Sequence, residues 1–362
     1  MEKILITDVG VAPAENVIKS FNQSAKKEEI IGVSRNPIQL FSSKADTKRH
    51  IPYEHAFGDE YKKALLKLLA DEKPSLAVFM NDREILEVSK LRNEIQAVGT
   101  KLFMPDHEVI ETCTDKYLSY KIWESEGIKV PKTVPINESS DLKKAFEQLG
   151  DKEGKVWLRS TIGAGGKGAL PTNDFEFAQN WIDIYKGWGS FTASELLQSE
   201  KTVTWLSIWY EGELVVAQTR RRKSWGFGNR TLSGVTGITG VGETYSDETV
   251  NRVAKDTIYA VDPKPHGVYG VDMTYDQNDF PNPTEINMRF FTTNYFFTEA
   301  GLNMPEIYKD IMLYQKFPSL EKKINPLPDG LLWIRDMDRE PILTTEKEIS
   351  KLLEIQQVPT HL

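Results

Sequence analysis

Polar side chains at alternating positions around Glu285 suit a metal ion. On a strand, Glu285, Asn287 and Arg289 would share one face, because side chains two apart point the same way. An earlier strand carries Asp272, and a turn over 277–283 would fold both strands into an antiparallel hairpin with Asp272 opposite Glu285 to Asn287. Two carboxylates and an amide oxygen are hard ligands suited to Mg²⁺, and Arg289 could hold a phosphate or a carboxylate. A solvated strand face is the alternative interpretation.

A glycine-rich segment could approach phosphate groups. Glycines at 163, 165, 166 and 168 give a backbone whose N–H groups can come close to phosphate oxygens. A dinucleotide-binding loop would open into a helix, but Ala-Leu-Pro follows here and predicts a strand. A Walker loop requires Ser or Thr after Gly-Lys, where this chain has Gly168. We therefore predict a glycine hairpin between antiparallel strands that closes over phosphates; a plain flexible turn is the alternative.

The densest basic cluster of the chain lies at 219–223. If this segment is a strand, Arg220 and Arg222 point to one face and Arg221 to the other. Arg220 and Arg222 could then hold a substrate carboxylate or the transferred phosphate, whereas a solvated strand end is the alternative. The Gly/Thr-rich stretch at 232–243 predicts a loop over the substrate.

The elements that must position these residues differ between the two halves of the chain. In the first hundred residues, apolar strands alternate with amphipathic helices, which predicts βαβ units and a parallel sheet. The predicted strands there are 3–7, 29–33 and 75–80, with helices ending near Asn22 and covering 61–69. Further helices are predicted at 114–127, 140–149 and 174–185, and β-rich stretches at 155–159, 203–218, 268–275 and 284–290. The tail predicts a strand at 330–335 and a helix at 345–353.

Composition narrows the class of protein. The chain has 362 residues and a net charge of −8, which argues against non-specific binding to nucleic acid or to an anionic membrane. Neither a secretory signal nor an apolar run long enough to span a membrane is found in the sequence. Cys113 is the only cysteine, which excludes an intramolecular disulfide, and the five histidines have no metal-ligand spacing. We expect a cytoplasmic protein in which Cys113 is a packed residue.

Taken in order, these motifs resemble the ATP-grasp superfamily, most of all the branch of carbamoyl-phosphate synthase large chains and carboxylate–amine ligases. The resemblance covers about residues 1–315 and rests on five motifs: Asp115-Lys116 opening a helix that ends in Gly-Ile-Lys-Val-Pro, Arg159 before the glycines, Ser194-Glu195-Leu-Leu, Gly270-Val-Asp272, and Glu285-Ile-Asn287-Met-Arg289. It implies an α/β N-terminal pre-ATP-grasp (Rossmann-like) domain followed by an α+β ATP-grasp fold. The implied limits are 1–112, 113–317 with a glycine-flap subdomain at about 130–198, and a C-terminal appendage at 318–362.

The resemblance also implies a role for each matching residue. ATP would be bound by Lys116, Arg159, Gly163, Gly165, Gly166, Glu195, Leu196, Leu197 and Glu200, the last of these at the ribose. Mg²⁺, which Mn²⁺ could replace, would be held by Asp272, Glu285 and Asn287. Arg289 of the last motif would be a catalytic group, together with Arg220 and Arg222, which are proposed from the strand pattern of the basic cluster and not from the resemblance. Met288 stands where relatives usually have proline, which bears on backbone rigidity and not on the ligands.

The activity implied by the resemblance is an ATP-dependent ligase that joins a small-molecule carboxylate to an amine or ammonia through an acyl phosphate and releases ADP and phosphate. Relatives are commonly dimers, so a homodimer is among the expected assemblies. One alternative is carbamoyl-phosphate-like activation of bicarbonate, which Arg159 favours and the single ATP-grasp unit opposes. Another is an inactive nucleotide-binding scaffold, which would have no need of Lys116, Asp272 and Glu285 together.

Overall fold

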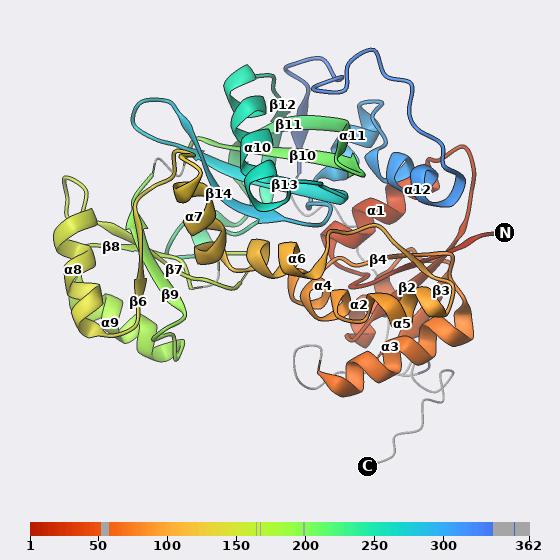
Figure 1. Ribbon diagram of the computed structural model, residues 1–362, viewed down its shortest axis with the longest axis horizontal. Coiled ribbons are helices and arrows are strands. Elements are labelled where there is room, and N and C mark those ends of the chain that lie inside the picture. Colours follow the sequence, from red (N-terminus) through yellow and green to blue (C-terminus); the bar gives the residue numbers. More distant parts are fainter. Residues whose placement is uncertain (52–57, 164, 167, 198–199, 336–350, 352–362) are drawn as a thin grey trace.

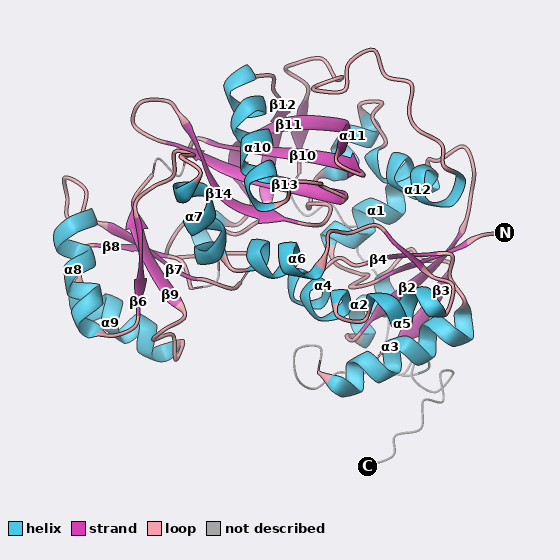
Figure 2. Cartoon of the chain, in the orientation of Figure 1, coloured by secondary structure: helices cyan, strands magenta, loops and turns pink. Residues whose placement is uncertain are grey.

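The computed structural model describes residues 1–51, 58–163, 165–166, 168–197, 200–335 and 351. These residues form three β-sheets with helices packed on them (Figures 1 and 2). We call the sheets the parallel sheet, the flap sheet and the central sheet. Within the described residues, no helix is long and apolar enough to cross a membrane.

The parallel sheet is built from the first hundred residues, as the alternating pattern predicts. Its strand order is β3-β2-β1-β4-β5, and all of its pairs are parallel. The strands are β1 (Lys3–Ile6), β2 (Glu29–Ser34), β3 (Thr47–His50), β4 (Leu76–Val78) and β5 (Lys101–Leu102). The helices between them are α1 (Ala12–Asn22), α2 (Pro37–Ser42), α3 (Asp59–Glu72), α4 (Asp82–Ser89) and α5 (Arg92–Ala97).

Two helices lead from the parallel sheet to the rest of the molecule. These are α6 (His107–Thr114) and α7 (Lys116–Ser125), and α7 lies between the flap sheet and the parallel sheet in Figure 1. The Asp115 carboxylate accepts hydrogen bonds from the backbone N–H groups of Tyr117 (2.8 Å) and Leu118 (3.2 Å), which caps α7 and fixes its start. Lys116 is therefore the first residue of the helix. The domain limit expected near residue 112 falls inside α6.

The flap sheet has the order β6-β9-β7-β8 and lies at one end of the molecule (Figure 1). Its elements are β6 (Thr133–Ile136), α8 (Ser139–Leu149), β7 (Val156–Ser160), β8 (Leu170–Thr172), α9 (Phe175–Ile184) and β9 (Phe191–Glu195). Leu142, Ile182 and Ala193 belong to a hydrophobic core of its own. The glycine segment joins β7 to β8, which pair antiparallel, so the predicted glycine hairpin is confirmed.

The central sheet has the order β14-β13-β10-β11-β12-β15 and is antiparallel throughout. Its strands are β10 (Thr202–Tyr210), β11 (Glu213–Trp225), β12 (Thr239–Thr244), β13 (Gly267–Tyr275), β14 (Pro281–Asn287) and β15 (Leu332–Ile334), and α10 (Glu248–Val261) packs on it. The remaining elements are the 3₁₀ turn η1 (Gly228–Arg230), α11 (Asn294–Glu299) and α12 (Met304–Tyr314). Its Trp205 shares a hydrophobic core with Leu5 of the parallel sheet, so the two sheets are packed through one apolar interior.

The sequence-based elements need several corrections. The β-rich stretch 203–218 is confirmed and contains two strands, because Glu211 and Gly212 form a turn with positive φ angles of 52° and 91° that separates β10 from β11. The stretch 232–243 is a loop only as far as Ile238, and its last part pairs with β11 as β12. The tail strand is confirmed as β15, which joins the central sheet through β12. The helix predicted at 345–353 lies, except for residue 351, outside the described residues.

Candidate functional site

A cavity of about 360 Å³ lies between the flap sheet, the glycine hairpin and the central sheet. Most of the site residues proposed from the sequence line it: Lys116, Arg159, Gly163, Gly165, Gly166, Glu195, Leu196, Leu197, Arg220, Arg222, Asp272, Glu285, Asn287 and Arg289. Glu200 is exposed and is not among the described residues that line this cavity. The chain thus brings residues from distant segments to one cavity.

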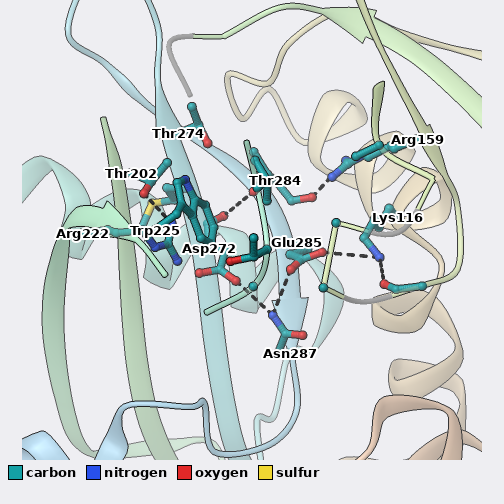
Figure 3. A pocket seen from close by; sticks show the side chains of 18 of the residues that line it. Lys116, Arg159, Thr202, Arg222, Trp225, Asp272, Thr274, Thr284, Glu285 and Asn287 are labelled. Carbon is teal, nitrogen blue, oxygen red and sulfur yellow. Dashed lines mark hydrogen bonds and ion pairs between the residues drawn. The ribbon is translucent and has the colours of Figure 1, made fainter. Parts of the chain in front are cut away.

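Asp272, Glu285 and Asn287 meet on the β13–β14 hairpin, as their spacing predicts. Asp272 pairs directly with Glu285 in the register of the two strands. The Asn287 amide donates hydrogen bonds to Asp272 Oδ2 (3.2 Å) and Glu285 Oε1 (3.3 Å), so the three side chains converge (Figure 3). The expected turn is present but ends earlier than predicted, because Pro281 already pairs with Tyr275, and Asp279 has a positive φ of 56° within the turn.

Lys116 joins this carboxylate pair from the start of α7. Its ammonium donates to the carbonyl oxygen of Gly163 (2.6 Å) and lies 3.4 Å from Glu285 Oε2 (Figure 3). Burial of Glu285 opposes its ionisation, but the charges of Lys116 and Arg159 outweigh that effect and keep the pKa of this carboxyl below its ordinary value. Burial and the adjacent Glu285 charge raise the pKa of Asp272.

These residues fit a hard divalent cation. Asp272 and Glu285 offer buried carboxylate oxygens, and the Glu285 charge helps to raise the pKa of Asp272. Asn287 turns its amide nitrogen to both carboxylates and its oxygen to Arg289 Nη2 (3.4 Å), so the amide would rotate to offer that oxygen to a cation. Within the described part of the chain, no group of three His, Cys, Asp or Glu side chains could hold a metal by itself. A cation on this hairpin would therefore share its coordination with the Asn287 amide oxygen and with a ligand such as a phosphate.

Arg159 and the glycine hairpin cover the other side of the cavity. The Arg159 guanidinium donates to the carbonyl oxygen of Thr284 (3.0 Å), and its Nε has no partner among the described residues. Gly165 and Gly166 have positive φ angles of 68° and 71°. A Cβ on Gly166 would come within 2.4 Å of the Val235 carbonyl oxygen, so only glycine allows this close approach to the β11–β12 loop.

The same loop touches the hairpin a second time through Gly237. A Cβ on Gly237, whose φ is +72°, would lie 2.9 Å from the Cα of Gly165. Two glycines therefore pack backbone against backbone where the hairpin and the loop meet above the cavity. Gly234 in the same loop has a similar φ of +71° but no heavy atom within 4 Å of its would-be Cβ, so the contact is specific to Gly237.

Arg220 lies on the cavity side of β11 and is only 2% exposed. Its Nη1 donates to the hydroxyls of Thr239 and Thr293, both at 2.7 Å, and its Nη2 donates to the hydroxyl of Thr204 at 2.6 Å. The guanidinium lies 4.8 Å from the centre of the Phe291 ring, and its Nε has no partner among the described residues. Burial, with the nearby Arg222 charge, lowers the pKa of Arg220 to about 9.

Arg222 shares this face of β11. Its Nε donates to the Thr239 hydroxyl (3.0 Å) and its Nη1 to the Thr202 hydroxyl, while its guanidinium stacks 3.5 Å from the centre of the Trp225 ring. Burial lowers the pKa of Arg222 to about 10, with Asp272 opposing the shift. The predicted alternation is confirmed, because Arg221 points away and pairs with Glu243 (2.6 Å).

Arg289 is anchored by the N-terminal part of the chain. Its Nε and Nη2 both donate to Asp82 Oδ2, at 3.0 and 2.8 Å, and Asp82 is the first residue of α4. Burial opposes the charged form of Arg289, but the Asp82 carboxylate outweighs it and raises the pKa of Arg289. Asp82 therefore fixes the guanidinium at the edge of the cavity.

Several of these neighbours were not found from the sequence. Thr202 and Thr204 alternate on β10 and could have been recognised as a hydroxyl face once the partner strand was known. Asp82 and Phe291 carry no local pattern that marks them. Cys113 is buried at 2% exposure, and burial raises the pKa of its thiol, as expected for a packed residue.

Comparison with known proteins gives fold relatives only. No protein-family model matches the sequence, and no curated protein matches it significantly. Among solved structures, carboxyaminoimidazole ribonucleotide synthase from Aspergillus clavatus with ATP is similar at a TM-score of 0.66 and 16% identity, over 89% of this chain and 79% of that one. The biotin carboxylase domain of Hydrogenobacter thermophilus 2-oxoglutarate carboxylase, with MgADP and bicarbonate, is similar at a TM-score of 0.68 and 14% identity, over 91% of this chain and 73% of that one.

A third similar structure is the L-amino acid ligase from Bacillus licheniformis, with a TM-score of 0.64 and 12% identity over 87% of this chain and 74% of that chain. At such identities the likeness concerns the three-dimensional arrangement and not the roles of single residues. It extends over the parallel, flap and central sheets together, because nearly nine-tenths of the chain is covered. The chain therefore has the fold that these structures share, which is the ATP-grasp fold implied by the sequence resemblance.

Proposed function

We propose that the protein is an ATP-dependent carboxylate–amine ligase that activates its acid as an acyl phosphate and releases ADP and phosphate. The observation that carries the proposal is one row of side chains across neighbouring strands of the central sheet. Glu285 on β14 pairs with Asp272 on β13, Asp272 pairs with Thr204 on β10, and Thr204 pairs with Arg220 on β11. Carboxylates at one end of the row and a guanidinium at the other suit a metal-bound phosphate and an anionic acid side by side.

The spacing of this row suits transfer between the two ligands. Neighbouring strands lie about 4.8 Å apart, so the Asp272 and Arg220 backbones are separated by roughly 10 Å across β10. The Thr204 hydroxyl lies between the two charged groups, because it donates a hydrogen bond to the Asp272 carboxylate and accepts one from the Arg220 guanidinium. A phosphate near Asp272 and a carboxylate near Arg220 would therefore meet above β10, within reach of each other.

Each set of residues has a proposed binding role. Lys116, Arg159 and the N–H groups of the glycine hairpin would hold the ATP phosphates, and Leu196 and Leu197 would contact the adenine. Asp272, Glu285 and Asn287 would hold Mg²⁺, which supplies neutralisation of phosphate charge when bound. Arg289, held by Asp82, would face the transferred phosphate. Glu200 remains a proposal from the sequence alone.

The chemistry follows from these positions. A carboxylate oxygen of the acid attacks the γ-phosphorus, the bond from that phosphorus to the β–γ bridging oxygen breaks, and ADP leaves. The amine nitrogen then attacks the acyl carbon and gives up a proton, and phosphate leaves with the electrons of the C–O bond. No enzyme nucleophile is required, and Cys113 is buried with a raised pKa. The glycine hairpin and the β11–β12 loop would exclude water from the acyl phosphate.

The test is nucleotide turnover with Mg²⁺ and pooled carboxylic acids, crossed with amino acids, other amines and ammonia, with ADP resolved from AMP. We expect ADP and phosphate to form only when an acid and an amine are both present. Formation of AMP and pyrophosphate would contradict the acyl-phosphate mechanism. The absence of any turnover in every pool would contradict a ligase for these substrate classes.

A further inference from the structure

We infer that the acid substrate is an organic carboxylate with an apolar body, and not bicarbonate, and that this body lies against Phe291, Ile238 and Pro13. The inference rests on the ligase function proposed above and deepens it by naming the class of acid. It draws on the contacts of Arg220 and on the side chains that surround that guanidinium.

The Arg220 end of the cavity is built for an anion. Arg220 and Arg222 both donate to the single hydroxyl of Thr239, at 2.7 and 3.0 Å, so two guanidinium groups lie close together. Among the described residues neither forms an ion pair with a carboxylate; their hydrogen bonds go to threonine hydroxyls. Two buried cations this close repel each other, the charge of Asp272 offsets that repulsion only in part, and an anion bound between them would relieve it. Arg220 lines the cavity, and its Nη2 carries a second N–H besides the one that it donates to Thr204, which leaves a donor for that anion.

The residues around this anion site come from two segments whose polar atoms are already engaged. Thr293 and Thr239 accept hydrogen bonds from Arg220. Two positions before Thr293 is Phe291, whose ring centre lies 4.8 Å from the Arg220 guanidinium. Ile238 immediately precedes Thr239, packs its Cγ2 toward Gly226 and, like Phe291, is one of the residues that line the cavity. The threonine hydroxyls thus face the guanidinium, and apolar residues of the same two segments lie next to them at the cavity.

Helix α1 adds a third apolar side chain to this wall. The Asn16 amide donates to the carbonyl oxygen of Thr292 at 3.0 Å, which ties the first turns of α1 to the segment after β14. Pro13, one turn earlier on α1, lines the cavity. Pro13, Ile238 and Phe291 therefore come from three separate parts of the chain to the same end of the cavity.

An apolar wall beside an anion site discriminates between acids. Bicarbonate carries polar oxygens on every side and would leave its third oxygen against Phe291 and Ile238 without a hydrogen-bond partner. An organic acid would instead bury its carbon chain there, at a gain in kcat/KM of about fourfold for each methylene group. The carboxylate itself would remain on Arg220, next to the phosphate site.

The experiment measures acid activation without requiring the natural amine. The protein is given MgATP, excess hydroxylamine and one acid at a time: bicarbonate, acetate, propionate, butyrate or hexanoate. Hydroxylamine nitrogen attacks the acyl carbon of the acyl phosphate and phosphate leaves, so each organic acid yields a hydroxamate and ADP. We expect kcat/KM to rise from acetate to butyrate by about fourfold per methylene, with bicarbonate at the no-acid rate.

Two variants in the β11–β12 loop test whether the apolar residues beside Arg220 contact the carbon chain of the acid. Ile238→Ala should flatten the rise with chain length, because Ile238 lines the cavity. Leu232→Ala removes the same kind of side chain from the same loop, but Leu232 is 64% exposed and is not among the described lining residues, so its rise should match the wild type. Binding of MgATP, measured by calorimetry, should be the same in both variants.

The outcomes separate this inference from the proposed function. Faster turnover with bicarbonate than with any organic acid, or equal turnover with all of them, would overturn the apolar-acid inference and leave the ligase standing. A flattened rise in Leu232→Ala as well as in Ile238→Ala would remove the assignment of the wall. No acid-dependent ADP with any of the acids would overturn the ligase proposal and the inference with it.

Discussion

On β13 and β14 the cavity floor carries carboxylates with cations close by, whereas on β11 it carries guanidinium groups whose partners are hydroxyls. Glu285 lies 3.4 Å from the Lys116 ammonium, and its pKa is lowered. Arg220 is bonded to three threonines, and its pKa is lowered by burial to about 9. The first region offers carboxylate oxygens to a cation, whereas the direct partners of the Arg220 guanidinium among the described residues are hydroxyls, with the Asp272 charge offsetting its burial only in part. This difference separates a place for a cation from a place for an anion.

The largest loss of activity is expected when a carboxylate of the β13–β14 hairpin loses its charge. Glu285→Gln keeps the shape of the side chain but removes a charged ligand, so we expect Mg²⁺-dependent ADP formation to fall about 1,000-fold with the fold intact. ADP release during Mg²⁺ titration and circular dichroism would check both points. Asp279→Asn is the matched control, because Asp279 is on the turn of the same hairpin with its side chain 67% exposed. Full activity in Glu285→Gln would refute the metal assignment.

Removing the Arg220 guanidinium should lower activity toward the acid without lowering the stability of the ligand-free protein. Arg220→Met removes the anion's partner, so kcat/KM for the acid should fall about 100-fold, the equivalent of a lost charged hydrogen bond. The dissociation constant of MgATP should change little. Because Arg220 is a buried charge with neutral partners, the ligand-free variant should unfold at the same temperature or higher.

Arg221→Met is the control for that variant. Arg221 is the next residue, points to the other face and pairs with Glu243, so kcat/KM for the acid should stay near the wild-type value. Steady-state kinetics with acid and ATP varied separately, together with thermal unfolding, would make the comparison. An equal loss of ATP and acid affinity in Arg220→Met would place Arg220 at the phosphates.

A smaller effect tests whether the contact between the glycine hairpin and the β11–β12 loop keeps water out of the cavity. Gly237→Ala adds a Cβ 2.9 Å from the Gly165 Cα, which should hold the hairpin and the loop apart and raise acyl-phosphate loss to water about tenfold. Gly234→Ala has the same backbone strain of about 1–2 kcal/mol, since its φ is +71°, but meets no atom. The ratio of phosphate released to product formed is the measurement. Equal uncoupling in the two variants would assign the effect to strain.

The smallest effect on activity is expected at a buried carboxyl away from the cavity, which acts on stability instead. Burial, with the nearby Asp8 charge, raises the pKa of Glu84 from 4.5 to about 8. The folded state then binds a proton more tightly than the unfolded state, so this group's contribution to stability falls as pH rises from about 4.5 to 8. Glu84→Gln should remove that decline, which denaturant unfolding at several pH values would show. An unchanged pH slope would mean that Glu84 is ionised in the folded protein.

Short-range patterns predicted the parts of the site that one hairpin can build. Glu285 and Asn287 share a strand face, and the turn length sets the pairing with Asp272, so this group followed from spacing alone. The glycine hairpin also followed, because four glycines before a second strand leave few other structures. The sequence resemblance to the ATP-grasp superfamily agrees with the fold that the solved structures share.

Contacts between segments that are distant in the sequence could not be predicted from local patterns. Asp82 reaches Arg289 across 207 positions, and Thr293 reaches Arg220 across 73. Such pairs depend on how the parallel and central sheets pack, which no local pattern encodes. For the same reason the composition of 232–243 predicts a loop throughout, although its last part pairs with β11 as β12.

The most direct test of the central claim is to follow one oxygen atom. The protein would be given MgATP, hydroxylamine and butyrate labelled with ¹⁸O in its carboxylate, and the released phosphate would be analysed by mass spectrometry. If the carboxylate attacks the γ-phosphorus, one ¹⁸O atom must pass from the acid into the phosphate for each hydroxamate formed. Hydroxamate formation with unlabelled phosphate, or with the label in AMP, would contradict activation through an acyl phosphate.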